Sequence, residues 1–174
     1  MNGSEERDAA RSDIETLTRR STELIERVER DTTEEERVRK PSSDAWSLTE
    51  VAQHLALVAG GILRTAHPAK RGASVIGAAK SALLRGVLRS RLKIRAPVAG
   101  IVPRPGVTWS DAQNNVRRSL EGWKAFVDGN AFEQTGFRHP FVGSLTPAET
   151  TGFLVEHFDH HMRQVERLFA GLKV

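Results

Sequence analysis

The sequence of 174 residues contains no cysteine. This absence excludes disulfides, zinc–thiolate sites and cysteine nucleophiles, and it is compatible with a reducing cytoplasm, where we expect the protein to act. Long apolar runs are also lacking, since the longest, at 55–63, is far shorter than the ~20 residues of a membrane span. The acidic N-terminus has no apolar segment of the secretory type. We therefore expect one globular domain over residues 1–174, with a flexible start at 1–11.

Acidic residues are absent between Glu50 and Asp111, where ten lysines and arginines occur. The net charge of +4 hides this asymmetry, because the rest of the chain has 16 basic and 22 acidic residues, a net charge of −6. Aromatic residues are absent between Ala66 and Thr108, so this basic region offers no rings on which bases could stack. We expect no nucleic-acid partner.

Helical periodicity appears in four segments, and no segment predicts a strand. Two of the starts are marked by a hydroxyl residue followed three positions later by glutamate, as in a capping box. Four helices of this length predict an all-α bundle. The predicted helices run from about Asp8 to Asp31, from Ser47 to the Gly60-Gly61 region, from Thr108 or Ser110 to Val127, and from Thr146 to Gly171.

The connection over residues 66–107 is far longer than the links of 2–8 residues that are usual in bundles. It contains "SVIGAAKSALLRGVLRSRLKIR", which predicts a further basic helix, followed by an extended tract rich in proline and glycine. Two interpretations remain open for it: a solvated arm folded over the bundle, or a positively charged approach for an anionic ligand. The second interpretation assigns an anion-guiding role to Arg85, Arg89, Arg91 and Lys93.

The stretch "EHFDHHMRQ" at 156–164 has three histidines within five positions. On a helical wheel of ~100° per residue, His161 points along the buried direction and His157 lies about 60° to one side. His160 lies roughly 120° away and is predicted to face outward. Because residues at i and i+4 stand one turn apart on one face, His157 and His161 suit a shared metal ion. Two hydrogen-bonded core histidines are the alternative.

A third inward histidine, His54, lies in the apolar second helix. Alone, it is typical of a core histidine whose ring nitrogens have found partners. Three inward histidines on two helices of one bundle favour a common metal site instead.

Two regions resemble the signature regions of the DinB/YfiT-like superfamily: "WSLTEVAQHL" at 46–55 and "HPFVGSLTPAETTGFLVEHFDHHMRQVERL" at 139–168. The resemblance extends over about residues 12–170. It implies an up-down-down-up four-helix bundle in which one histidine of the second helix and two of the fourth bind a divalent metal, often zinc or nickel. Matched position by position, these ligands are His54, His157 and His161.

The resemblance also bears on activity. Parts of this superfamily are S-transferases that use low-molecular-weight thiols, and other members have no assigned activity. We expect a metal-dependent transferase or hydrolase acting on a small, anionic molecule, with the fourth metal position open to substrate. A non-catalytic binding module with a vestigial site and a basic arm for acidic partners is the alternative. A homodimer would be unsurprising for such a bundle.

His139 precedes Pro140 where the family frequently shows His-Pro. It has two candidate roles: a contact to the substrate or to a metal ligand, or a loop histidine that fixes the turn. Asp159 and Glu156 could orient neighbouring imidazoles, but the wheel places both on the outer face.

Overall fold

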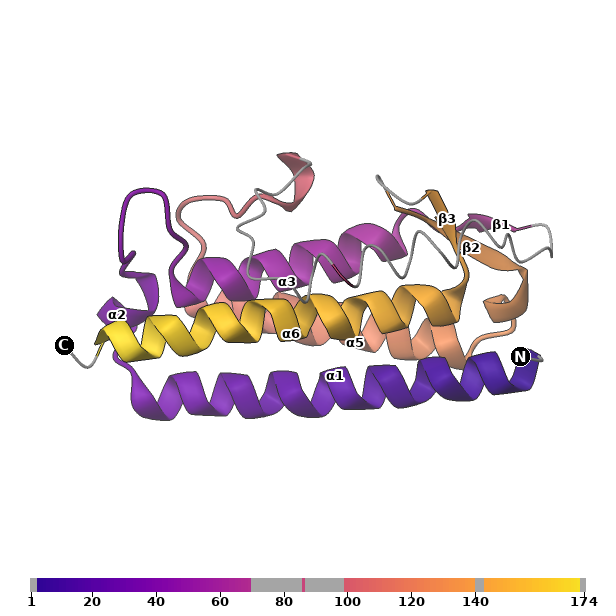
Figure 1. Cartoon of the computed structure of the whole chain (residues 1–174), viewed down its shortest axis with the longest axis horizontal. Coiled ribbons are helices and arrows are strands. Elements are labelled where there is room, and N and C mark those ends of the chain that lie inside the picture. The colour runs from indigo at the N-terminus through magenta and orange to yellow at the C-terminus, as the bar shows by residue number, and fades with distance from the viewer. Residues whose placement is uncertain (1–2, 70–85, 87–98, 140–142, 173–174) are drawn as a thin grey trace.

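A computed structural model describes residues 3–69, 86, 99–139 and 143–172. Four long helices run side by side and enclose the apolar core (Figure 1). They are α1 (Gly3–Asp31), α3 (Leu48–Leu63), α5 (Trp109–Asp128) and α6 (Pro147–Leu172). The predicted all-α bundle is therefore confirmed.

Helices α1 and α6 run in the same direction, as three polar contacts between them show. Each contact lies about two turns further along both helices than the one before. The Thr151 hydroxyl donates to Asp13 at 2.8 Å, and the two ion pairs that follow join arginines of α1 to acids of α6. These ion pairs are Arg20–Asp159 and Arg27–Glu166.

Helices α3 and α5 also run parallel to each other, and opposite to α1 and α6 (Figure 1). The Ser119 hydroxyl donates to the Ala56 carbonyl at 3.2 Å, and Trp123 Nε1 donates to the Ala59 carbonyl at 2.9 Å. The order of directions is thus up-down-down-up. Since α3 and α5 are parallel and consecutive in the bundle, the end of α3 and the start of α5 lie at opposite ends of it, which accounts for a long connection.

The predicted starts of the second, third and fourth helices agree with the observed caps of α3, α5 and α6. Ser47 and Glu50 form a reciprocal capping box at α3, with 3.2 Å from Glu50 N to Ser47 Oγ and 3.0 Å from Ser47 N to Glu50 Oε2. Thr146 and Glu149 cap α6 in the same way. At α5 the cap is Thr108, which accepts from the Asp111 amide at 3.1 Å, rather than Ser110.

Three short strands correct the prediction that the chain has none. They are β1 (His67–Pro68), β2 (Thr135–His139) and β3 (Gly143–Leu145), joined in the antiparallel order β1-β2-β3. The sheet lies at the end of the bundle where α1 begins and α3 ends (Figure 1). A short 3₁₀ helix, η2 (Phe132–Gln134), leads into β2.

The first helix also starts before Asp8, the predicted start. α1 begins at Gly3, and Arg7 anchors its first turns by donating to the carbonyls of Val127 and Gly129 at 3.2 and 3.0 Å. After α1 the chain forms a further short helix, α2 (Glu34–Val38), which the sequence analysis did not predict.

The basic helix predicted within the connection falls on residues 70–85 and 87–98, outside the described residues. The connection is described again at the 3₁₀ helix η1 (Ala99–Ile101), which lies against α3. No helix among the described residues is both long enough and apolar enough to cross a membrane.

Candidate metal centre

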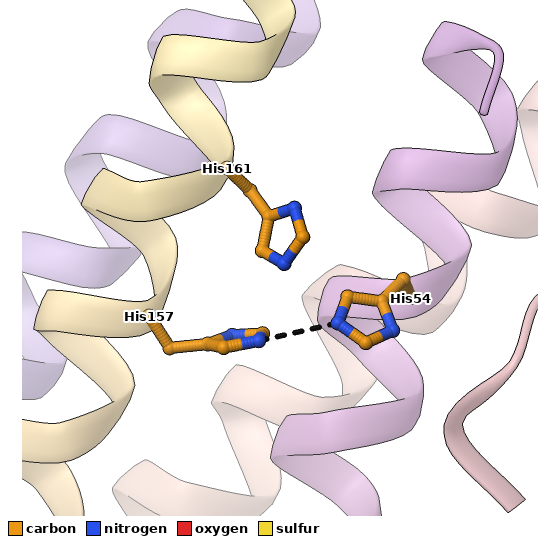
Figure 2. Close-up of side chains that lie close together, drawn as sticks. All are labelled: His54, His157 and His161. Atoms are coloured by element: carbon orange, nitrogen blue, oxygen red, sulfur yellow. Dashed lines mark hydrogen bonds between the residues drawn. The ribbon is translucent and has the colours of Figure 1, made fainter. Parts of the chain in front are cut away.

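Helices α3 and α6 bring His54, His157 and His161 together in the bundle interior (Figure 2). His54 Nε2 and His157 Nε2 are 3.2 Å apart. One ring nitrogen from each of the three histidines lies within 4.8 Å of the other two. The structure thus brings together the three side chains that the sequence predicts as metal ligands.

Two of the three rings are held by acceptors at their Nδ1 atoms. His54 Nδ1 donates to the Ile101 carbonyl at 2.7 Å, and His161 Nδ1 donates to Gln164 Oε1 at 3.0 Å. A carbonyl or amide oxygen only accepts, so each of these Nδ1 atoms bears the hydrogen and each Nε2 keeps a lone pair. This is the arrangement by which metal-binding histidines are usually oriented.

The contact at Ile101 shows that the long connection contributes to the site. Its described end reaches α3 at a second point, where the Arg104 amide donates to Gln53 Oε1 at 2.8 Å. Gln53 is buried and directly precedes His54. The connection therefore fixes the His54 ring through one backbone carbonyl and is itself fixed by the neighbouring side chain.

All three histidines are buried, with exposed fractions of 3% for His54, 8% for His157 and 7% for His161. Desolvation lowers the pKa of His54, lowers that of His157 well below its usual value, and lowers that of His161 to about 3. Charges on the neighbouring imidazoles add to the effect at each ring. The three rings are therefore neutral near pH 7, the form in which histidine binds metals.

The geometry fits a divalent ion. Two nitrogens bound tetrahedrally to zinc at about 2.0–2.1 Å lie about 3.3–3.4 Å apart, close to the 3.2 Å between His54 Nε2 and His157 Nε2. The Nε2 lone pairs of His54 and His161, together with the neutral imidazole of His157, thus form a donor set that could hold a metal ion.

Trp46 belongs to this site, although the sequence analysis gave it no role. Its ring centroid lies 4.6 Å from that of His54 and 5.9 Å from that of His161, with an angle of 20° between the Trp46 and His161 planes. The half-buried indole forms an apolar wall beside both rings. The available sequence signal was its position directly before the cap Ser47, where an apolar side chain often packs back on the helix.

His139 is the last described residue of β2, not a loop residue, and is 8% exposed. Its ring centroid lies 4.8 Å from that of Phe153, which lies 5.6 Å from that of His157. Phe153 thus bridges His139 and the histidine group. Desolvation lowers the pKa of His139 as well.

His160 lies outside the group and is half buried rather than fully outward. Its ring centroid is 5.1 Å from that of His161, in an edge-on contact, and its Nδ1 lies 3.5 Å from Arg163 Nη2. Asp159 pairs with Arg20 across the helix interface, so it serves the packing of α1 on α6 rather than an imidazole.

The proposed anion-guiding residues Arg85, Arg89, Arg91 and Lys93 all lie outside the described residues. Among the residues described, the connection meets the site at Ile101.

The fold and the site together define a four-helix bundle protein with a buried three-histidine group able to hold a metal ion. The family model of the DinB superfamily matches residues 13–165, and the chain belongs to this superfamily. A solved structure described as "Crystal structure of TT2238, a four-helix bundle protein" is similar at 18% identity and a TM-score of 0.49, over 92% of this chain and 98% of that chain. No curated protein matches the sequence.

Proposed function

We propose that this protein is a metal-dependent enzyme acting on a small molecule, with zinc or nickel held by His54, His157 and His161. The observation that carries the proposal is the convergence of three buried neutral imidazoles from two helices within 4.8 Å. Among the described residues, His161 Nε2 has no hydrogen-bond partner, and burying such a nitrogen costs ~1–3 kcal/mol, a cost that a shared ion would remove.

Three protein ligands are typical of a catalytic rather than a structural zinc site, because the fourth position stays open to water or substrate. When bound there, the ion would act as a Lewis acid and lower the pKa of a coordinated water or thiol. The protein supplies the rest: Ile101 and Gln164 orient two rings, and Trp46 excludes water from one side.

A nucleophilic thiol, if the reaction uses one, must come from a low-molecular-weight cosubstrate because the chain has no cysteine. Thiol transfer and hydrolysis are the two reaction classes that we propose for the site. A reducing cytoplasm would supply such thiols. His139, buried behind Phe153, is proposed as a residue that contacts the substrate or a ligand ring.

The first test is the metal content of the purified protein, measured by plasma mass spectrometry. We expect roughly one zinc or nickel per chain in the wild type, loss of that metal in His157→Ala, and retention in His67→Ala. His67 is a matched control because it is a histidine of β1 that lies outside the group. Absence of metal in all three proteins would favour the non-catalytic binding module, which contacts acidic partners through its basic connection.

The anionic character of the substrate is tested separately. Replacing Arg85, Arg89, Arg91 and Lys93 together with Gln removes four of the eight basic residues between 70 and 95, a stretch without acidic residues. We expect weaker binding of a carboxylate-bearing thiol and a flatter salt dependence, with unchanged metal content, since salt screens charges over ~8 Å at physiological ionic strength. Binding equal to wild type at both low and high salt would contradict this role.

A further inference from the structure

His157 differs from the other two histidines in how its hydrogen is placed. Its Nε2 lies 3.2 Å from His54 Nε2, and that His54 atom bears a lone pair because Nδ1 donates to Ile101. A hydrogen bond between the two Nε2 atoms therefore requires the hydrogen to reside on His157 Nε2. Without metal, His157 is accordingly the Nε2–H tautomer, and its Nδ1 is an acceptor.

Binding of the metal through His157 Nε2, the nitrogen that lies 3.2 Å from His54 Nε2, would demand the opposite tautomer of His157 alone. A ligand nitrogen must present a lone pair, so the hydrogen on His157 Nε2 must leave. His54 and His161 already present lone pairs at Nε2 and need no change. If the His157 ring stays neutral, the proton given up by Nε2 to solvent is balanced by one taken up at Nδ1, and Nδ1 becomes a donor.

Whatever contacts His157 Nδ1 must therefore donate in one state and accept in the other. A backbone carbonyl or a side-chain amide oxygen only accepts, whereas a hydroxyl or a water molecule does both. Within the described part of the chain, His157 Nδ1 has no hydrogen-bond partner.

A pocket of the required kind adjoins His157. It has a volume of about 30 Å³ and lies between all four long helices, with mostly apolar walls. Its polar lining comes from His157, Ser21 of α1 and Ser119 of α5. Ser21 is 4% exposed, and its hydroxyl makes no hydrogen bond to any described residue. Ser119 donates to backbone carbonyls, so its oxygen can still accept.

The volume and the polar groups suit one water molecule. A cavity needs roughly 10–15 Å³ to hold a water, and the water needs two to four polar partners. Ser21, Ser119 and His157, all of which line the pocket, supply three polar side chains. A water at this place would also provide the unpaired Ser21 hydroxyl with a partner.

We propose that Ser21 is a positioning residue for His157, acting through a water molecule in this pocket that donates to Nδ1 before metal binding and accepts from it afterwards. The inference rests on the proposed metal site. On this inference, His54 and His161 keep the same tautomer with and without metal, whereas His157 changes its tautomer when the metal binds.

The test is long-range proton–nitrogen correlation spectroscopy of the ¹⁵N-labelled protein, which distinguishes the two neutral tautomers, before and after one equivalent of zinc. Before zinc we expect Nδ1–H at His54 and His161 and Nε2–H at His157. After zinc, His157 should show Nδ1–H while the other two keep their tautomers. Zinc bound with His157 still carrying Nε2–H would overturn the inference and leave the proposed function standing. A wild type that binds no zinc would overturn both.

Variants of Ser21 test the positioning role through zinc affinity, measured by competition with a chromophoric chelator. Ser21→Ala should weaken zinc binding by about 10–100-fold, as expected for loss of a partner that orients a metal ligand. Ser21→Thr keeps the hydroxyl and should restore most of the affinity. Thr22→Ala is the matched control, since that hydroxyl is exposed on the same helix and donates to the Thr18 carbonyl.

The melting curves of the metal-free variants separate a loss of positioning from a loss of folding. Ser21→Ala is expected to melt close to the wild type, because alanine favours the helix. Equal zinc affinity in Ser21→Ala and Thr22→Ala, with both proteins folded, would show that Ser21 does not position His157.

Discussion

Two clusters of rings pack against the bundle helices, and they differ in what their rings require. The histidine group lies between α3 and α6, whereas an aromatic cluster lies where α5 meets η2 and β2. In the aromatic cluster, neighbouring ring centroids are 4.9–5.8 Å apart. Its members are Trp123, Phe126, Phe132 and Phe137.

The aromatic cluster needs no ligand to satisfy its polar atoms. Its one polar atom, Trp123 Nε1, donates to the Ala59 carbonyl at 2.9 Å. The histidine group brings six ring nitrogens into the interior, and each unsatisfied one opposes folding. Apolar side chains would fill the same space without that cost. The aromatic cluster thus stabilises the fold. The histidine group stabilises it less than apolar side chains would, so the needs of folding alone do not explain its presence.

The largest expected effect falls on the aromatic cluster. Phe137→Ala should lower the free energy of unfolding by about 3–5 kcal/mol, because Phe137 is fully buried and leaves a cavity. Zinc stoichiometry should stay at the wild-type value, since the ring contacts of Phe137 are with Trp123 and Phe126. Denaturant unfolding and metal analysis of the same sample would check both. Loss of metal along with stability would show that the two clusters are not independent.

Metal removal should act through the histidine group alone. A ligand present at ~100 times its Kd stabilises the folded state by ~2.7 kcal/mol, so adding EDTA to the zinc-loaded protein should lower the Tm without unfolding the bundle at room temperature. Phe137→Ala should show the same EDTA-dependent shift from a lower starting Tm. An unchanged melt after demonstrated metal removal would contradict the assignment of the site.

Acid should destabilise the metal-free protein through the histidines. The folded pKa of His161 is about 3 against 6.5 for the unfolded chain, so between these values the unfolded state binds a proton that the folded state does not. The free energy of unfolding should therefore fall by about 1.4 kcal/mol per pH unit below 6.5 for each such histidine. His161→Gln should make the dependence of the unfolding free energy on pH shallower by about 1.4 kcal/mol per pH unit. Phe137→Ala should leave this dependence unchanged. Urea unfolding at several pH values measures it.

The smallest expected effect concerns His160. His160→Ala should leave zinc affinity within a few-fold of wild type, because its ring contacts the edge of His161 and lies outside the group. A chelator competition assay checks this. A loss as large as that from His161→Ala would mean that His160, not one of the three inner rings, is a ligand.

The sequence predicted the bundle because its four long helices have strong periodicity and clear caps, Ser47 with Glu50 and Thr146 with Glu149 among them. β1 and β3 escaped prediction because they have only two and three residues, too few for a period of two to emerge. β2 has five residues, but buried and exposed positions do not alternate along it. The short helix α2 had a visible signal, since Thr33 and Glu36 form a capping box.

The sequence predicted which three histidines come together, but not the residues that accept hydrogen bonds from their rings. The i, i+4 spacing of His157 and His161 sets their common face by helix geometry alone. The acceptor of His54 is a backbone carbonyl 47 residues away, at Ile101, and a carbonyl has no sequence signature. The contact between His161 and Gln164 could have been predicted, because side chains three residues apart on one helix are neighbours.

The common direction of α1 and α6 has a mechanical consequence. The start of α1 and the end of α6 lie at opposite ends of the bundle (Figure 1). A force that pulls on these two ends slides one helix along the other. The contacts Asp13–Thr151, Arg20–Asp159 and Arg27–Glu166 then bear the load together instead of opening one after another. In a pair of antiparallel outer helices both ends would lie side by side, and the same pull would peel them apart. This chain is therefore loaded in shear when it is held by its two ends.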